Sequence, residues 1–433
     1  MTRLKLISLF IALVLFCTPV LAQTKPAAKK QTTTKSSAKK SSTTKSTAKK
    51  SSSSKSTAKK STTKKSSTTK KSSTTKSSSK KSSSSKKGSS KKSSSKKHSK
   101  KHSGTREVEE SHFVKVERSP VANIVSVLIG SRPLTNFIFL DSLEKPVLYP
   151  LKTANGIEVT RGFPLNPKPG DPIDHPHHIG LWFNYENVNG LDFWNNSYAI
   201  PKDKKSQYGW IRTDKILETT SGTVGKLGYH ANWTNQQGDV LLEEVTHFEF
   251  SGNANQRIID RFTTLTAVKN VKFADAKDGM LGLRLAHELQ IPTTEDQKFT
   301  DDKGNVTVVK GGTDNIPTGN YLTSAGKTGN DAWSTRGVWC KAYGKMEEDS
   351  VSVAIIDHPG NPNYPTFWHA RGYGLFGANP LGEKIFTNGK SEKNLTLKPG
   401  QSVTFKYRIV ISNGERTISA EKLNEMAKVF AEK

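Results

Sequence analysis

Apolar and polar residues alternate with a period of two over most of the chain after residue 104, and this pattern is typical of strands with one buried face. Gly, Pro, Asn and Asp separate the alternating runs, as expected of turns. The predicted strands cover residues 112–117, 123–130, 146–152, 157–163, 178–185, 241–250, 257–268, 281–291, 305–310, 351–358, 365–376 and 402–412.

Only the last segment has the period of a helix. After Ser419, apolar residues recur at Leu423, Met426, Ala427 and Phe430, which places them on one helical face. Many strands followed by one late helix predict an all-β fold, a large antiparallel β-sandwich with a C-terminal helix.

The first 22 residues have the pattern of a signal peptide. Arg3 and Lys5 precede an uncharged apolar run over residues 6–22, and the small-residue motif "VLA" comes directly before Gln23. Export to the periplasm or the extracellular space is therefore expected. No later apolar run approaches the roughly 20 residues that span a bilayer, so no transmembrane segment is expected in the mature chain.

Residues 23–104 form a tail of Lys, Ser and Thr, with 27 lysines and no acidic residue. Such a composition cannot bury a core and predicts disorder. The formal net charge of +29 comes from this end of the chain, since residues 105–433 hold 38 basic and 38 acidic residues. In an exported protein the expected partners of the tail are anionic envelope polymers, with a solvated spacer as the alternative; nucleic acid is not expected.

The folded domain is predicted over residues 105–433, and its most distinctive stretch is "DHPHHIGLWFNYENVNGLDFWNN", residues 174–196. In an extended chain, His178, Trp182, Asn184 and Glu186 share one face, while the apolar residues between them form the core face. An indole beside amide, imidazole and carboxylate groups suits a sugar, whose C–H faces stack on aromatic rings and whose hydroxyls need donors and acceptors.

A second strand repeats this pattern, with Phe367, His369, Arg371 and Tyr373 on one face. We expect the two strands to face one cavity that binds a carbohydrate, because Arg371 and His369 buried without partners would cost several kcal/mol. The alternative is a merely amphipathic exterior. The substrate-binding residues predicted in this way are Trp182, Asn184, Trp194, His369, Arg371 and Tyr373.

The histidines of the first stretch leave three roles open: metal ligation, acid–base catalysis, or structure. His175 and His177 have the spacing at which two imidazoles reach one divalent metal, with a third ligand from a distant segment such as Asp357 or His358. No dinucleotide or phosphate-loop fingerprint is present, so no nucleotide cofactor is expected. His287 alternates with leucines and is expected in the core, and Cys340, the one cysteine after cleavage, is expected as a small buried residue.

The motifs "DHPHHIGLWFNYENVNGLDFW", "FADAKDGMLGLRLAHEL", "AIIDHPGNPNYPTFWHARGYGLFGANPLG" and "FKYRIVISNG" resemble a bacterial family labelled PmoA-like, or "methane oxygenase PmoA". The resemblance spans most of residues 120–415. It implies a β-rich soluble domain with a sandwich similar to the galactose-mutarotase superfamily. A membrane copper oxygenase is excluded, because it would need several membrane-spanning helices.

Three functions are compatible with these observations. The first is an exported carbohydrate-active enzyme, a hydrolase, lyase or epimerase, in which a histidine and a carboxylate exchange protons. The others are a non-catalytic glycan-binding module and a structural envelope protein. The predicted catalytic residues are His177, His178, Glu186, Asp357 and His358.

Overall fold

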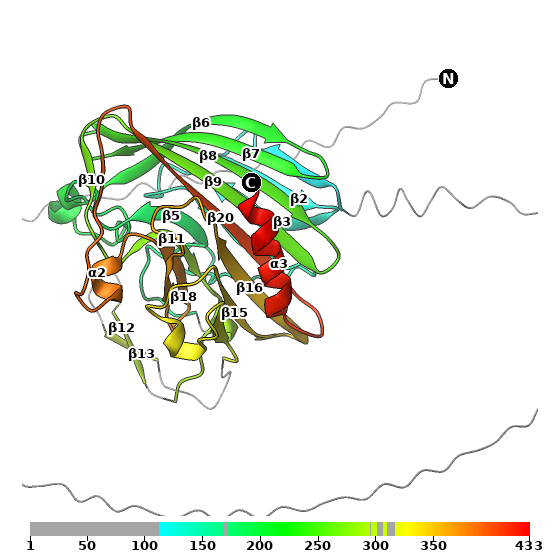
Figure 1. Ribbon diagram of the computed structural model, residues 1–433. Helices are drawn as coiled ribbons and strands as arrows, with labels where there is room; N and C mark the ends of the chain where they lie inside the picture. The colour runs from blue at the N-terminus through cyan, green and yellow to red at the C-terminus, as the bar shows by residue number, and fades with distance from the viewer. Residues whose placement is uncertain (1–111, 169–170, 295, 301–305, 310–316) are drawn as a thin grey trace, which may run out of the picture. The chain divides into compact units, whose positions relative to one another are not determined.

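The computed structural model (Figure 1) describes residues 112–168, 171–294, 296–300, 306–309 and 317–433. Chain contacts divide the protein into two units, Met1–Lys92 and Ser93–Lys433, and the described residues all belong to the second. The predicted signal peptide, 1–22, and the predicted tail, 23–104, lie outside the described residues. No helix among the described residues is long and apolar enough to cross a membrane.

The first large sheet of the described chain holds eight strands, and every neighbouring pair is antiparallel. Its strand order departs from chain order only after β5, where strands from distant segments join. From one edge to the other the strands are β1 (Val114–Arg118), β2 (Ile124–Ile129), β3 (Arg132–Ile138), β4 (Val147–Leu148), β5 (Leu181–Tyr185), β11 (Gly279–Arg284), β18 (Leu375–Asn379) and β17 (Phe367–Ala370).

The second large sheet also holds eight described strands, again with antiparallel neighbours. Two short pairs complete the strands: β10 (Val271–Phe273) with β19 (Leu395–Leu397), and β12 (Gln297–Thr300) with β13 (Val306–Val309). The order of the second sheet is β14 (Asn320–Thr323), β15 (Trp339–Met346), β16 (Asp349–Asp357), β20 (Ser402–Ser412), β9 (Gln256–Ala267), β8 (Val240–Gly252), β7 (Gly225–Thr234) and β6 (Trp210–Thr220).

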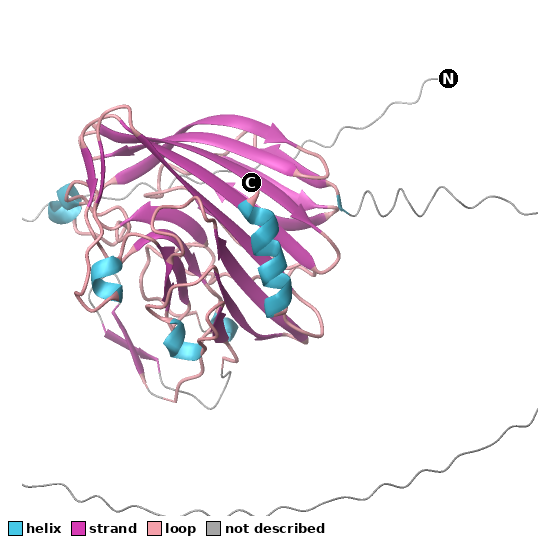
Figure 2. Ribbon diagram, in the orientation of Figure 1, coloured by secondary structure: helices cyan, strands magenta, loops and turns pink. Residues whose placement is uncertain are grey.

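The main hydrophobic core lies between the two large sheets. Phe137 of β3 stacks on Tyr229 of β7 with ring centroids 4.6 Å apart, and Phe183 of β5 meets Phe405 of β20 at 5.6 Å. All four side chains are buried in one cluster with residues of both sheets. The predicted all-β antiparallel sandwich is therefore confirmed, and Figure 2 shows how far strands predominate.

The C-terminal helix is also confirmed. Helix α3 (Ala420–Ala431) begins after Ser419, whose hydroxyl accepts a hydrogen bond from the Lys422 amide at 3.2 Å. Its apolar face packs on residues of β15, β16 and β20 that point away from the main core, as its position beside β16 and β20 in Figure 1 shows. The other helical elements are short: η1 (Lys202–Gln207), η2 (His287–Leu289), η3 (Gly329–Ala332) and α2 (Glu383–Phe386).

Three predicted strands differ from the structure. Residues 157–163 form only isolated bridges, at Glu158 and Thr160. The run 281–291 leaves the sheet after Arg284, so His287 lies half-buried in η2 rather than on an apolar strand face. The run 365–376 splits into β17 and β18 because a tight turn intervenes, where Gly374 takes a φ of +88° that favours glycine.

Cys340 lies in β15 and is fully buried among apolar side chains of the main core. Burial raises the pKa of its thiol well above the ordinary value. The prediction of a small buried residue is therefore confirmed.

Candidate functional site

The alternation predicted for the first stretch is present in β5. Leu181, Phe183 and Tyr185 point into the main core, so Trp182 and Asn184 point to the opposite face of the sheet. The alternation begins only at Leu181, because Gly180 has a φ of +55° and a Cβ there would lie 2.3 Å from the Leu148 carbonyl oxygen. Residues before Gly180 therefore form a loop over that outer face.

The two predicted site strands are joined through two others. Trp182 of β5 pairs with Gly282 of β11, Gly282 with Gly377 of β18, and Gly377 with His369 of β17. Residues in one such row point to the same face of an antiparallel sheet. Trp182 and His369 therefore share a face, with two glycines between them, and β5, β11 and β18 are seen side by side in Figure 1.

Position 282 requires glycine for a steric reason, since a Cβ there would lie 2.4 Å from Cε2 and Cζ2 of Trp182. The indole therefore lies flat over the neighbouring strand. We name the outer face of these four strands, with the loop of residues 174–178 above it, the polar face. It carries Asp174, His177, His178, Trp182, Asn184, Glu186, Asp278, Arg284, His369 and Arg371.

A buried ion-pair network holds the histidine loop. Arg284 donates to Oδ1 of Asp174 at 2.9 Å and forms an ion pair with Oδ2 at 2.9 Å, and Arg161 approaches Oδ1 of Asp174 at 3.2 Å. Arg161 also donates to the backbone carbonyls of Asp174, His175 and His178. Burial alone would raise the pKa of Asp174, but Arg284, His175 and Arg161 outweigh it and hold that pKa below its ordinary range.

The three histidines stack in this loop. His178 lies parallel to Trp182 at 5.2 Å and to His175 at 4.8 Å, and His175 in turn stacks on Tyr373 at 5.4 Å. His177 meets His178 edge-on at 4.3 Å. Burial lowers the pKa of His177 and of His178 well below the ordinary value, so both rings are neutral near pH 7.

The predicted metal site gains no support from this geometry. The His175 and His177 rings are 5.5 Å apart and nearly perpendicular, and Nδ1 of His175 is 2.5 Å from Oδ2 of Asp174. Asp174 is already taken up by two guanidinium groups. Within the described segments, no group of three or more His, Cys, Asp or Glu side chains is arranged to hold a metal ion.

A carboxyl and an imidazole meet at the other end of the polar face. Oδ1 of Asp278 is 3.4 Å from Nδ1 of His369, and the Asp278 amide donates to Oε2 of Glu186 at 3.0 Å. Burial, with Glu186 adding to it, raises the pKa of Asp278 to about 6 although Lys277 opposes the shift. Burial lowers the pKa of His369 well below the ordinary value. Asp278 is thus partly protonated near neutral pH beside a neutral imidazole.

Several buried polar atoms of the polar face have no hydrogen-bond partner among the described residues. They are Nε2 of His177, Nε1 of Trp182, Oδ1 of Asn184 and Nδ1 of His369. The Asn184 amide nitrogen donates to the Phe193 carbonyl at 2.6 Å, which fixes the side chain with Oδ1 unpaired. Leaving such a group unpaired costs about 1–3 kcal/mol, so a bound water, an ion or a ligand is expected to satisfy these atoms.

Partly exposed residues border these buried atoms. The His175 side chain is 43% exposed, and Glu186, Arg371 and Tyr373 are half-buried. The Arg371 guanidinium lies over the Trp333 ring at 4.2 Å, and Trp333 meets His369 edge-on at 4.7 Å.

Trp194 packs against this cluster. It is fully buried and packs edge-on against Trp182 at 5.1 Å and against His178 at 6.0 Å. Trp194 thus supports the Trp182 indole, and its part in substrate binding stays a prediction.

Asp357 and His358 are not brought to the polar face. Asp357 ends β16 in the second sheet, where its carboxylate accepts from the Asn361 side chain at 2.7 Å and from the Thr366 amide at 2.8 Å. His358 accepts from the Gly360 amide and packs on Phe430 of α3 at 5.2 Å. Both residues stabilise a turn instead of joining the other predicted catalytic residues.

The alternation pattern did not identify four charged residues that hold the site: Arg161, Arg284, Asp278 and Lys145. Arg284 is fully buried. Lys145 donates to the His177 carbonyl at 2.8 Å, and burial lowers its pKa to about 8. An arginine inside the apolar run "LGLRLA" is a usable signal, because a buried guanidinium requires a carboxylate partner.

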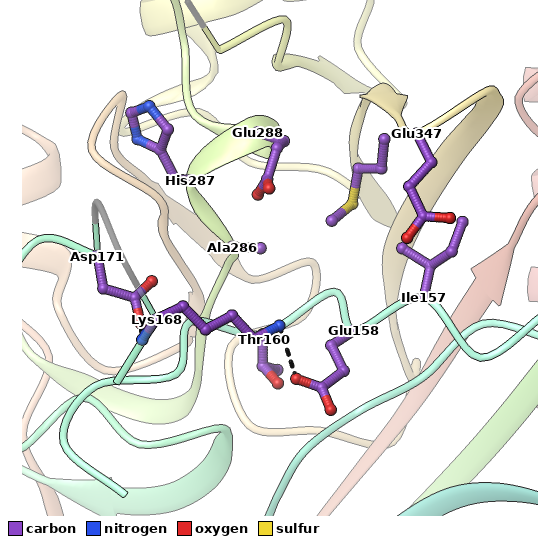
Figure 3. Close-up of a pocket in the computed structure, with 10 residues that line it drawn as sticks. Ile157, Glu158, Thr160, Lys168, Asp171, Ala286, His287, Glu288 and Glu347 are labelled. Atoms are coloured by element: carbon purple, nitrogen blue, oxygen red, sulfur yellow. Dashed lines mark hydrogen bonds and ion pairs between the residues drawn. The ribbon is translucent and has the colours of Figure 1, made fainter. Parts of the chain in front are cut away.

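A separate pocket of about 150 Å³ contains none of the predicted site residues (Figure 3). Glu158, Lys168, Glu288 and Glu347 are among the residues that line it, and the Lys168 ammonium pairs with Glu158 at 2.7 Å. The charged groups of this pocket are exposed or half-buried.

The sequence model of the family described as "Family of unknown function (DUF6807)" matches residues 124–428. None of the comparisons shows a relationship to the PmoA-like family, and among curated proteins none matches the sequence significantly.

Solved structures similar to the chain include a galactose mutarotase-like protein of Clostridium acetobutylicum, with 11% identity over 70% of this chain and 100% of that one and a TM-score of 0.34. A putative aldose 1-epimerase of Escherichia coli K12 has 8% identity, with 70% of this chain and 99% of that chain covered and a TM-score of 0.24. A GH36 alpha-galactosidase of Geobacillus stearothermophilus has 11% identity, with 70% of this chain and 41% of that chain covered and a TM-score of 0.26. At these TM-scores the superposition is partial, and the activities of those proteins do not carry over to this chain.

Proposed function

The chain belongs to the DUF6807 family, whose function is unknown, and we propose from its own residues that it binds a carbohydrate on the polar face and acts on it by proton transfer. The observation that carries the proposal is the group of unpaired buried donors and acceptors on Trp182, Asn184 and His369. A sugar ring presents hydroxyls that can donate and accept such hydrogen bonds.

The histidine loop supplies donors in this proposal. Nδ1 of His178 accepts from Arg284 at 3.1 Å, so the ring proton lies on Nε2, from which it can be donated to a sugar oxygen. His178 is therefore a binding residue. The earlier hypothesis that it shuttles the reacting proton is replaced, because its basic nitrogen is already occupied.

Asp278 and His369 are the proposed acid–base pair. A general acid or base works best when its pKa lies near the pH of the reaction, and the raised pKa of Asp278, about 6, meets this condition. Glu186 lies against Asp278 and disfavours a second negative charge there. Protonated Asp278 would donate to a sugar oxygen, and its carboxylate would take a proton back.

The test uses the full chain with a panel of neutral and acidic oligosaccharides. Binding is measured by calorimetry, and reaction products by chromatography and by NMR of the anomeric protons. Asp278→Asn is expected to retain binding and to lower turnover by about 10²- to 10⁴-fold. His369→Gln is expected to weaken both.

Two matched controls keep the test specific. Asp214→Asn removes an exposed carboxylate of β6, in the second sheet, that pairs with His230 at 2.6 Å. His358→Gln changes a histidine of the turn that follows β16. Both should leave binding and turnover unchanged. Binding without turnover in the wild type would leave a glycan-binding module, and no binding to any sugar would refute the proposal.

A further inference from the structure

Arg371 differs from every other cation on or beside the polar face. Arg284 and Arg161 are taken up by Asp174 and backbone carbonyls. Lys145 donates to a carbonyl, and Lys277 lies 3.3 Å from Asp278. Within the described part of the chain, Arg371 has neither a carboxylate partner nor a carbonyl acceptor for its guanidinium.

The surroundings of Arg371 fix its guanidinium in place. It stacks on the Trp333 ring at 4.2 Å and interacts with the Tyr373 hydroxyl. A planar guanidinium stacked in this way keeps its edge N–H groups free for a bidentate acceptor. Arg371 is half-buried, so a charge bound there would be less screened than at an open surface.

The position of Arg371 relative to the unpaired atoms is set by the sheet. Its amide bonds to the Leu375 carbonyl, two residues along from the pairing of His369 with Gly377. Two residues of a strand span about 6.6 Å, a length comparable to one sugar ring. The backbone positions of Arg371 and His369 are therefore separated by about the length of one sugar ring.

Charge is unevenly distributed along this face. Arg371, Arg284 and Arg161 lie toward one end, where Asp174 pairs with the last two. Asp278, Glu186 and Asp192 influence one another at the other end, where Lys277 pairs with Asp278. An anionic substituent is stabilised at the first end and repelled at the second. This division gives a charged ligand a single orientation.

We infer that the carbohydrate bound at the polar face carries a carboxylate, as a uronic acid does, and that Arg371 binds this group; the inference rests on the proposed function. A carboxylate matches the two parallel donors of a guanidinium edge. The ligand is then held with its carboxylate at Arg371, next to the half-buried Tyr373.

The experiment compares polyuronate oligosaccharides with the same oligosaccharides after reduction of their carboxyls to primary alcohols. Calorimetry on the full wild-type chain is expected to show binding of the uronates at least 10-fold tighter than binding of the reduced forms. Arg371→Gln should lower uronate affinity by about 10- to 100-fold and leave the reduced forms within about twofold. Arg371→Lys should restore only part of the lost affinity, because a lysine ammonium lacks the two parallel N–H donors of a guanidinium edge.

Arg212 offers a matched control, since it also stacks on an indole, Trp210, at 3.9 Å, but lies in β6 of the second sheet. Arg212→Gln should leave uronate binding unchanged. Equal binding of charged and reduced sugars by the wild type would overturn the inference and leave the proposed function standing. Tighter binding of sulfated or phosphorylated sugars than of uronates would overturn the assignment of a carboxylate, and no binding of any sugar would refute the proposed function as well.

Discussion

Nη1 of Arg284 lies 3.1 Å from Nδ1 of His178. A guanidinium only donates hydrogen bonds, so Nδ1 of His178 must be the accepting nitrogen of a neutral ring. The same guanidinium holds Asp174 through both carboxylate oxygens. One buried arginine thus sets both the position of the histidine loop and the tautomer of His178.

Arg284→Met is expected to lower the free energy of unfolding by about 3–5 kcal/mol, because it leaves the buried Asp174 carboxylate with fewer partners. Urea denaturation followed by circular dichroism measures the change. Arg371→Gln is the control and should cost less than about 1 kcal/mol, since Arg371 has no ion pair to lose within the described chain. An Arg284→Met variant as stable as the wild type would contradict the structural role of the network.

Asp278 should make the fold less stable as the pH rises. Its pKa is raised by burial to about 6 in the folded chain, against about 3.9 in an unfolded chain. Between these values the folded state binds more protons than the unfolded state, so stability falls as the pH rises from about 4 to about 6.

The Asp278→Asn variant is therefore expected not to show this fall in stability. At pH 7 its free energy of unfolding should exceed that of the wild type by about 1–3 kcal/mol. Thermal and urea unfolding at pH 4 and at pH 7 measure the difference. A fall in stability that persists unchanged in the variant would show that another group is responsible.

Gly282→Ala should disturb the indole that forms the floor of the site. The new Cβ would lie 2.4 Å from Cζ2 of Trp182 and 2.7 Å from Cη2 of Trp194, so both rings must shift. We expect a loss of about 1–3 kcal/mol and altered tryptophan fluorescence, together with weaker ligand binding. Gly222→Ala is the control, because its Cβ meets nothing closer than the Val224 carbonyl at 3.5 Å.

Deletion of residues 23–104 should leave the melting temperature nearly unchanged, because their Lys, Ser and Thr residues offer no apolar surface to the domain. The deletion should weaken retention on heparin or lipopolysaccharide at low salt, where exposed charges are least screened. A melting temperature lower by many degrees would show that the tail packs against the domain. Fractionation of cells that express the full chain tests the proposed export.

The fold class was predictable because its determinants are local. The period of two in β5 is a property of any extended chain, so the division between Leu181 and Trp182 follows from neighbouring residues alone. Helix α3 was equally predictable from its spacing and from Ser419 at its start. The strand predicted at 157–163 was wrong because its apolar pattern is satisfied by loop packing with only isolated bridges.

The sequence alone therefore determined the sandwich class, the terminal helix, the buried Cys340 and the shared face of Trp182 and Asn184. Tertiary structure alone decided which charged groups meet: Arg284 reaches Asp174 across 110 residues, and His369 joins Trp182 only through the register of β11 and β18. It also separated Asp357 and His358 from the other histidines. The physical reason is that side-chain alternation arises within one strand, whereas register and strand order depend on packing between segments far apart in the chain.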